Sequence, residues 1–104
     1  MSETRFVAFL TPDDRIRHHH SSVKGTITWF AIQYEAFIHR GWHPIVRYDT
    51  AHGFAHCDRM HPNGKVDKVA LPHWDFNEAL TFAEYDIKSN WEVYREQYEK
   101  EMRR

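Results

Sequence analysis

The hydrophobic period of the sequence changes at Pro72, and this change limits the chain to folds that combine β-strands with one long helix. After Pro72 the apolar residues recur at helical spacing and form a stripe about 100° wide, as a helix packed along a sheet requires. Seven residues make up this stripe: Leu80, Ala83, Ile87, Trp91, Tyr94, Tyr98 and Met102. Asp75 can cap the first turn, and Glu78 completes a capping-box spacing. We predict a single helix that begins near Asp75.

Before Pro72 the sequence favours strands, because β-branched and aromatic residues dominate and turn residues recur at short intervals. The longest such segment is 26–39, and alternation gives it one continuous apolar face, which we expect to lie on the core. This face consists of Phe30, Ile32, Tyr34, Ala36 and Ile38. The other predicted strands are 5–10, 45–49, 54–60 and 66–71, with 15–20 as a continuing edge. We therefore predict an α+β fold in which an antiparallel β-meander of four or five strands packs against one long C-terminal helix.

Turn signals separate these strands. Residues 40–44 contain Gly41 and Pro44 and are predicted as a turn, and Asn63 followed by Gly64 is the strongest short hairpin signal in the chain. The histidine triplet 18–20 lies near the start of the sheet. Alternation would point its members to opposite faces, so we predict a solvated edge or loop here in preference to a metal site.

Length and composition indicate one domain, residues 1–104. The apolar fraction of 41% supplies a core, but no stretch approaches the ~18 apolar residues of a membrane span. Residues 1–14 lack the basic start and cleavage site of a secretory signal, so we expect a cytoplasmic protein. Cys57 is the only cysteine, which excludes an internal disulfide.

The side chains suited to chemistry are concentrated in residues 47–64. They are Arg47, Asp49, His52, His56, Asp58 and His61. Arg47 and Asp49 share one face of a strand, and His56 and Asp58 share one face of the next, so a bend at residues 51–53 would bring the four together. His52 stands at that bend. Cys57 alternates away from His56, and His61 has the opposite parity, so His61 joins only if the strand has ended or bulged.

One interpretation is metal-independent cleavage of a phosphodiester bond, with no cofactor. His52 and His56 would act as general acid and base, with His61 as a further working imidazole. Asp49 or Asp58 would orient an imidazole. Arg47 would hold the phosphate and stabilise its developing charge.

A metal site is the first alternative, with His52, His56, Asp58 and His61 as ligands for zinc or another divalent transition metal. Gly53 interrupts the His-x3-His spacing, and a strand would separate its ends by about 13 Å, which weakens this interpretation. A purely structural role is the second alternative, in which the polar side chains cap turns and pair with neighbouring strands.

Partners are suggested by surface features. Three apolar residues point away from the helical stripe: Phe82, Tyr85 and Val93. We expect either that they form a homodimer contact, or that the helix breaks near Thr81 or the first strands cover them. A dimeric, non-enzymatic binding or regulatory module is therefore the competing function. The net charge of -1 is not the strongly basic footprint of a nucleic-acid-binding domain, so charge alone does not decide whether RNA is bound.

Residues 47–64 read RYDTAHGFAHCDRMHPNG, a run that resembles a group of small bacterial and archaeal proteins. It is also similar to the TumE-type toxins of type II toxin-antitoxin systems, which show RYD, then HG, then a histidine-rich pair. Arg47, Asp49, His52 and His56 match this outline, whereas Asp58 stands where a second histidine is expected. The resemblance implies a toxin-antitoxin setting, with a cognate antitoxin protein as partner and RNA or translation as target.

Overall fold

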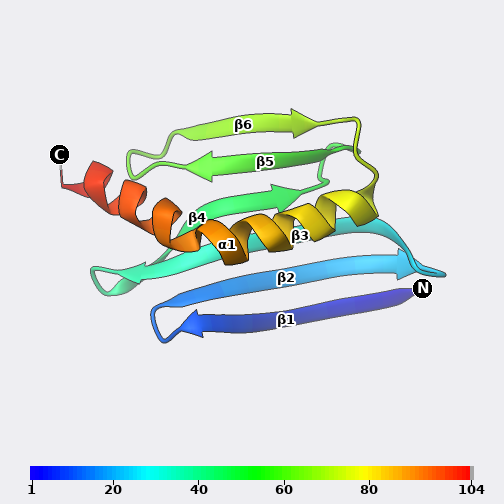
Figure 1. The fold of residues 1–104 in the computed structure, drawn as a ribbon, viewed down its shortest axis with the longest axis horizontal. Helices are drawn as coiled ribbons and strands as arrows, with labels where there is room; N and C mark the ends of the chain where they lie inside the picture. Colours follow the sequence, from blue (N-terminus) through cyan, green and yellow to red (C-terminus); the bar gives the residue numbers. More distant parts are fainter. Residues whose placement is uncertain (104) are drawn as a thin grey trace.

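The computed structural model describes residues 1–103 and contains a six-stranded antiparallel sheet packed against one long C-terminal helix (Figure 1). Each strand pairs with the next along the chain. The strands are β1 (Ser2–Thr11), β2 (Asp14–Val23), β3 (Thr26–Ile38), β4 (Gly41–Asp49), β5 (Ala55–Met60) and β6 (Val66–Leu71), and the helix is α1 (Phe76–Met102). The predicted α+β meander is confirmed, with six strands in place of the expected four or five.

The strand that the sequence undervalued is β2. It pairs with β1 on one side and β3 on the other, so it is an interior strand. The predicted solvated edge or loop for the histidine triplet is therefore wrong, and His18 is buried at 4% exposure. The triplet does alternate between the two faces as expected. The triplet lies in a strand because β2 pairs with β1 and β3. A run of histidines and arginines does not by itself indicate such pairing.

The turn that joins β3 and β4 is tighter than predicted. His39 and Arg40 both adopt positive φ angles, 50° and 66°, as a two-residue hairpin turn requires. The predicted turn at 40–44 is thus wrong, because β4 already begins at Gly41. Pro44 lies where the β3–β4 register shifts, and such an irregularity tolerates a residue without an N–H. The predicted turn at Asn63 and Gly64 is confirmed, with Gly64 at φ +88°.

The core lies between the sheet and α1, which contacts β3 and β4. All five residues of the predicted apolar face of β3 are buried. The helix begins as predicted, since Asp75 Oδ1 accepts a hydrogen bond of 2.8 Å from the Glu78 N–H. No helix in the described part of the chain is long and apolar enough to span a membrane.

Buried carboxylates fix the helix on the sheet. Asp14 accepts hydrogen bonds from the Tyr34 hydroxyl at 2.6 Å and from Arg95 at 2.8 Å. Asp86 on α1 accepts hydrogen bonds from the hydroxyls of Tyr48 at 2.7 Å and Tyr94 at 2.6 Å. Each tyrosine therefore contributes a hydrogen bond as well as apolar contact area.

The helix is continuous through Thr81, so the predicted alternative of a break there is wrong. Phe82 packs edge-on against Trp74, with 4.6 Å between ring centroids, yet it stays partly exposed. Tyr85 and Val93 are more exposed still. All three side chains are exposed, so the predicted alternative in which the first strands cover them is wrong.

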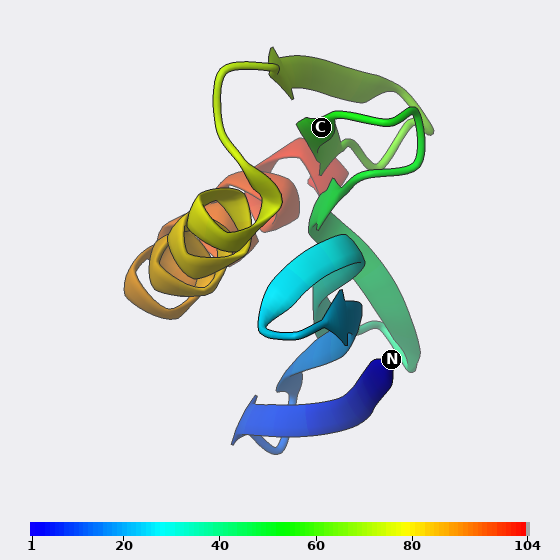
Figure 2. The same ribbon diagram turned by 90° about the vertical axis from the view of Figure 1, so that its right-hand side faces the viewer.

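Figure 2 shows that α1 lies against one face of the sheet and leaves the other face uncovered. We call this uncovered side the open face. It carries Arg17, Gln33, Arg47 and Asp58, which follow one another across β2, β3, β4 and β5.

Candidate functional site

Strand register arranges the polar side chains of the open face in two rows that run across the sheet. The first row consists of Arg5, His19, Ala31, Asp49 and His56. The second consists of Val7, Arg17, Gln33, Arg47, Asp58 and Lys68. Pairing of β4 with β5 places Asp49 opposite His56 and Arg47 opposite Asp58. The sequence prediction that these four residues share one face is confirmed.

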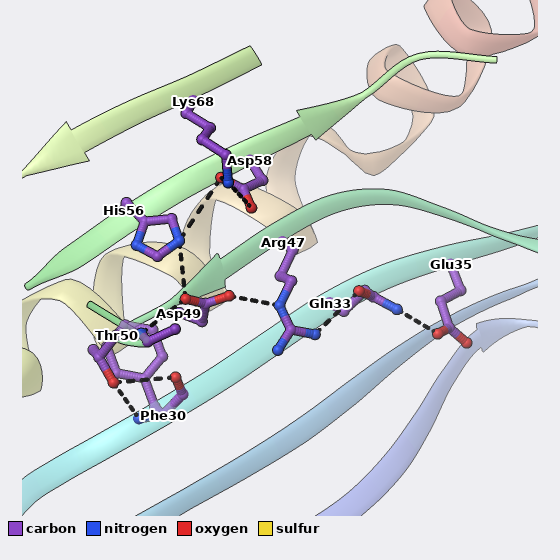
Figure 3. Close-up of polar contacts among 10 residues, drawn as sticks. Phe30, Gln33, Glu35, Arg47, Asp49, Thr50, His56, Asp58 and Lys68 are labelled. Carbon is purple, nitrogen blue, oxygen red and sulfur yellow. Dashed lines mark hydrogen bonds and ion pairs between the residues drawn. The ribbon is translucent and has the colours of Figure 1, made fainter. Parts of the chain in front are cut away.

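The centre of the site is a buried cluster of one imidazole and two carboxylates, Asp49, His56 and Asp58 (Figure 3). His56 Nε2 lies 2.9 Å from Asp49 Oδ1 and 3.8 Å from Asp58 Oδ1. All three residues are buried, with less than one-tenth of each residue's surface exposed. Buried charges persist only when they are paired, so the surrounding cations decide how this cluster is held together.

Two cations neutralise the cluster (Figure 3). Arg47 Nε donates to Asp49 Oδ2 at 2.6 Å, and Lys68 Nζ lies 3.3 Å from Asp58 Oδ2. The network continues from Arg47 to Gln33 Oε1 at 3.3 Å and from Gln33 to Glu35 at 2.6 Å. The two carboxylates are thus matched by two cations before any charge on His56 is counted.

Asp49 is held in its charged form. Burial acts to raise the pKa of this carboxyl, but hydrogen bonds from the Ala51 N–H and from Arg47 outweigh burial and leave the pKa below its ordinary value. A carboxylate only accepts hydrogen bonds, so neutral His56 must direct its Nε2–H toward Asp49. Its other nitrogen, Nδ1, is buried and has no hydrogen-bond partner. In this tautomer Nδ1 carries a free lone pair that can accept a proton.

The bend between β4 and β5 brings His52 to the site. Thr50 fixes the start of the bend, because its Oγ1 accepts the Phe30 N–H at 3.1 Å (Figure 3). Gly53, at φ +86°, donates its N–H to the Thr50 carbonyl at 3.0 Å. His52 is exposed at the corner, as predicted, and its ring stacks on His56 with 5.6 Å between centroids.

The remaining predicted member, His61, is not brought to this cluster. It follows the end of β5, where Nε2 lies 2.7 Å from Asp67 and Nδ1 lies 3.0 Å from Glu101 on α1. The four residue steps from His56 to Met60 alone span about 13 Å of strand. The predicted metal-ligand set of His52, His56, Asp58 and His61 is therefore not assembled.

Cys57 points to the opposite side of β5, as alternation predicted. It lies opposite Tyr48 in the register, and burial raises the pKa of its thiol to about 11. A protonated, inward-facing thiol is a poor nucleophile. The chemistry of the open face therefore belongs to imidazole, carboxylate and guanidinium groups.

Sequence reasoning missed several members of the network. Gln33, Glu35 and Lys68 come from β3 and β6, and only the strand register places them beside residues of β4 and β5. Thr50 was also missed, although it directly follows the Arg-Tyr-Asp run. The alternation of β3 did place Gln33 and Glu35 on its non-core face, and this was the one available signal.

Two kinds of chemistry fit the cluster. The imidazole with its free Nδ1 can exchange a proton, with Asp49 as its orienting partner. Alternatively, one ligand atom from each of Asp49, His56 and Asp58 lies within 4.8 Å of the others, which is close enough for one ion to contact all three. An ion would have to compete with Arg47 and Lys68 for the carboxylates.

The chain belongs to the DUF7718 family, a domain of unknown function, whose model matches residues 1–104. No curated protein and no solved structure matches the chain. The family match covers the full sequence and names no activity, so the chemical evidence comes from the geometry of the cluster.

Proposed function

We propose that this DUF7718 protein is a small toxin-like ribonuclease that needs no metal ion. The observation that carries the proposal is the buried His56 imidazole, oriented by Asp49, which also binds Arg47, on the sheet face that α1 leaves uncovered. Burial and the 2.9 Å contact of Nε2 with Asp49 Oδ1 hold the ring in one orientation, which is what a proton-transfer group requires. A turn-capping histidine would need neither the two carboxylates nor the arginine.

The proposed reaction is transesterification within the RNA strand. The ribose 2′-hydroxyl attacks the adjacent phosphorus, its proton passes to an imidazole, and the bond from phosphorus to the 5′-oxygen breaks. A second imidazole gives a proton to that leaving oxygen. The products are a 2′,3′-cyclic phosphate and a free 5′-hydroxyl, so atoms and protons balance.

Each residue has a defined role in this scheme. His56 accepts the proton at Nδ1, and exposed His52 is the proton donor. Asp49 and Asp58 orient His56, and Arg47 stabilises the charge that develops on phosphorus. Because the rings of His52 and Phe54 lie against His56, the bend at residues 50–54 must move for RNA to reach Nδ1.

The test uses one oligonucleotide sequence made both as RNA and as DNA. Wild-type protein should cut the RNA equally with and without a chelator and leave the DNA intact, since DNA lacks the 2′-hydroxyl. His56→Asn and His52→Ala should each slow cleavage at least ~100-fold, the typical contribution of a positioned acid or base. His73→Ala, at an exposed position outside the site, is the matched control and should behave as wild type. Intact RNA under every condition would contradict the proposal.

The toxin-antitoxin setting is proposed from the similarity of residues 47–64 to TumE-type toxins. Induced expression should slow growth of a bacterial host, and His56→Asn should relieve the effect. A cognate antitoxin would be expected to cover the open face, because that face carries the proposed site. Equal growth with wild type and His56→Asn would count against a toxin that acts through this cluster.

A divalent metal site is the second candidate, because the ligand atoms of Asp49, His56 and Asp58 lie so close together. If this candidate holds, protein expressed with supplemented zinc or manganese should retain metal after purification, and Asp58→Asn should lose it. Asp67→Asn is the matched control, because Asp67 lies on β6 and contacts His61. Metal-free wild type after supplementation would remove this candidate.

A further inference from the structure

Beside the cluster, the open face has a hollow of about 420 Å³ with three arginines in its wall. Its lining comes from the first four strands and combines apolar residues such as Phe6 and Val7 with Arg5, Arg17, Ala31 and Arg47. Ala31 is the smallest of these, and it lies between His19 and Asp49 in the first row. The short side chain at this position leaves space above the sheet, and the arginines surround that space.

The three arginines keep free donors. Each makes one or two contacts: Arg5 with Glu3 and His19, Arg17 with Glu35, and Arg47 with Asp49 and Gln33. A guanidinium has five N–H donors, so donors remain on every one of them. The side chains of Arg5 and Arg17 are more than half exposed. Planar, exposed guanidinium groups from three strands are suited to phosphate oxygens.

The carboxylates at the edge of the hollow are already paired. Glu35 accepts hydrogen bonds from Arg15 at 2.6 Å and from Gln33 at 2.6 Å. Asp49 is bonded to His56 and Arg47. These two groups are buried, and Glu3, whose side chain is half exposed, is paired with His19 at 2.6 Å and Arg5 at 3.6 Å.

An aromatic ring adjoins the cationic wall. Trp29 is 37% exposed and meets the His19 ring edge-on, with 4.4 Å between centroids. Arginines interleaved with an exposed aromatic ring are the recurring surface for single-stranded nucleic acid, in which phosphates meet cations and bases stack on rings. An acidic peptide would use the arginines but would have no need of the ring.

We propose that this hollow binds the phosphodiester backbone of single-stranded nucleic acid, with Arg5, Arg17 and Arg47 on phosphates and Trp29 against a base. This inference rests on the proposed function, because its ligand is the backbone of the substrate proposed there. Ala31 on β3 is two strands from His56 on β5, a distance of about 10 Å across the sheet. A strand held in the hollow would therefore extend directly to the proposed acid–base group.

Binding is tested with a fluorescently labelled DNA decamer, which the proposed chemistry cannot cut, so failure of cleavage and failure of binding are separate results. Anisotropy titrations would compare wild type with the Arg5→Gln, Arg17→Gln double variant at several salt concentrations. The matched control is Arg40→Gln, Lys65→Gln, which removes the same charge from exposed turns away from the hollow. Arg47 is left intact because it belongs to the proposed site.

The double variant should bind at least tenfold more weakly than the control, and its salt dependence should be shallower by ~1.4, since each single-strand phosphate contact contributes ~0.7. Single Arg5→Gln, at a highly exposed side chain, should show about half of that change in slope. Equal affinity of the double variant and the control would overturn the proposal. So would binding of a polyglutamate peptide or of inorganic phosphate as tight as that of the decamer.

Discussion

At the scale of single residues, Thr50 illustrates how the site depends on the backbone beside it. Its Oγ1 accepts the Phe30 N–H at 3.1 Å, and its own N–H donates to the Phe30 carbonyl at 3.2 Å. Phe30 and Thr50 are both buried, and Asp49 immediately precedes Thr50 in the sequence. Thr50 thereby extends the β3–β4 pairing by one residue and holds Asp49 against His56.

Thr50→Val keeps the shape of the side chain and leaves the buried Phe30 N–H without an acceptor. The free energy of unfolding should fall by about 1–3 kcal/mol, the cost of an unsatisfied buried donor. Chemical denaturation measures this, with Thr81→Val on the exposed side of α1 as the control. A Thr50→Val protein as stable as that control would show that the hydrogen bond does not hold the bend.

Residue parity predicted much of the site and failed where parity does not apply. Arg47 with Asp49, and His56 with Asp58, share a face because alternation is a property of every strand. His61 follows the end of β5, so its direction is set by Asp67 and Glu101, and the latter lies 40 residues later in the sequence. Such a contact is fixed by tertiary packing and leaves no local signal.

At the scale of elements, two histidines connect the sheet to α1 in opposite electrostatic settings. His18 on β2 stacks on Phe6 and lies 3.6 Å from Glu84, and burial lowers the pKa of His18 despite that carboxylate. His61 joins the β5–β6 turn to the end of α1. Hydrogen bonds to Asp67 and Glu101 raise the pKa of His61.

These shifts predict pH effects of opposite sign. Since the pKa of His18 is lower in the folded state, its contribution is complete above the unfolded value near ~6.5 and is lost as pH falls toward the folded value. Since the pKa of His61 is raised, its contribution is complete below ~6.5 and is lost as pH rises through the folded value.

Urea unfolding from pH 5 to 8.5 checks both signs. Relative to wild type, His18→Gln should lose less stability on acidification, and His61→Gln should lose less stability on alkalinisation. Slopes that shift in the same direction for the two variants would contradict this assignment. His39→Gln, at an exposed turn position, controls for the loss of a histidine elsewhere.

The helix and strands were predicted well where their own sequences carry a clear apolar or capping pattern. The apolar face of β3 and the Asp75 cap of α1 are local signals, and both were predicted correctly. β2 was undervalued because its interior position comes from its neighbours. The β3–β4 turn was predicted at 40–44, later than its position at His39 and Arg40, because neither residue is the glycine or asparagine that positive φ angles usually select.

At the scale of the whole molecule, the two faces of the sheet have different roles. One face and α1 enclose the core (Figure 2), whereas the open face carries the cluster and its cations (Figure 3). The hollow lies beside them on the open face. The proposed ribonuclease activity depends on both faces of the sheet. The packed face holds the register of β3, β4 and β5, and that register places Asp49, His56 and Arg47 together.

The most direct measurement of the central proposal is the chemical nature of the RNA ends after incubation with purified protein. Mass spectrometry should find 2′,3′-cyclic phosphate and 5′-hydroxyl ends with wild type and with His73→Ala, in the presence of a chelator. It should find full-length RNA with His56→Asn. Uncut RNA with wild type, or the same cyclic ends in equal yield with His56→Asn, would contradict the assignment of His56 as the proton-transfer group.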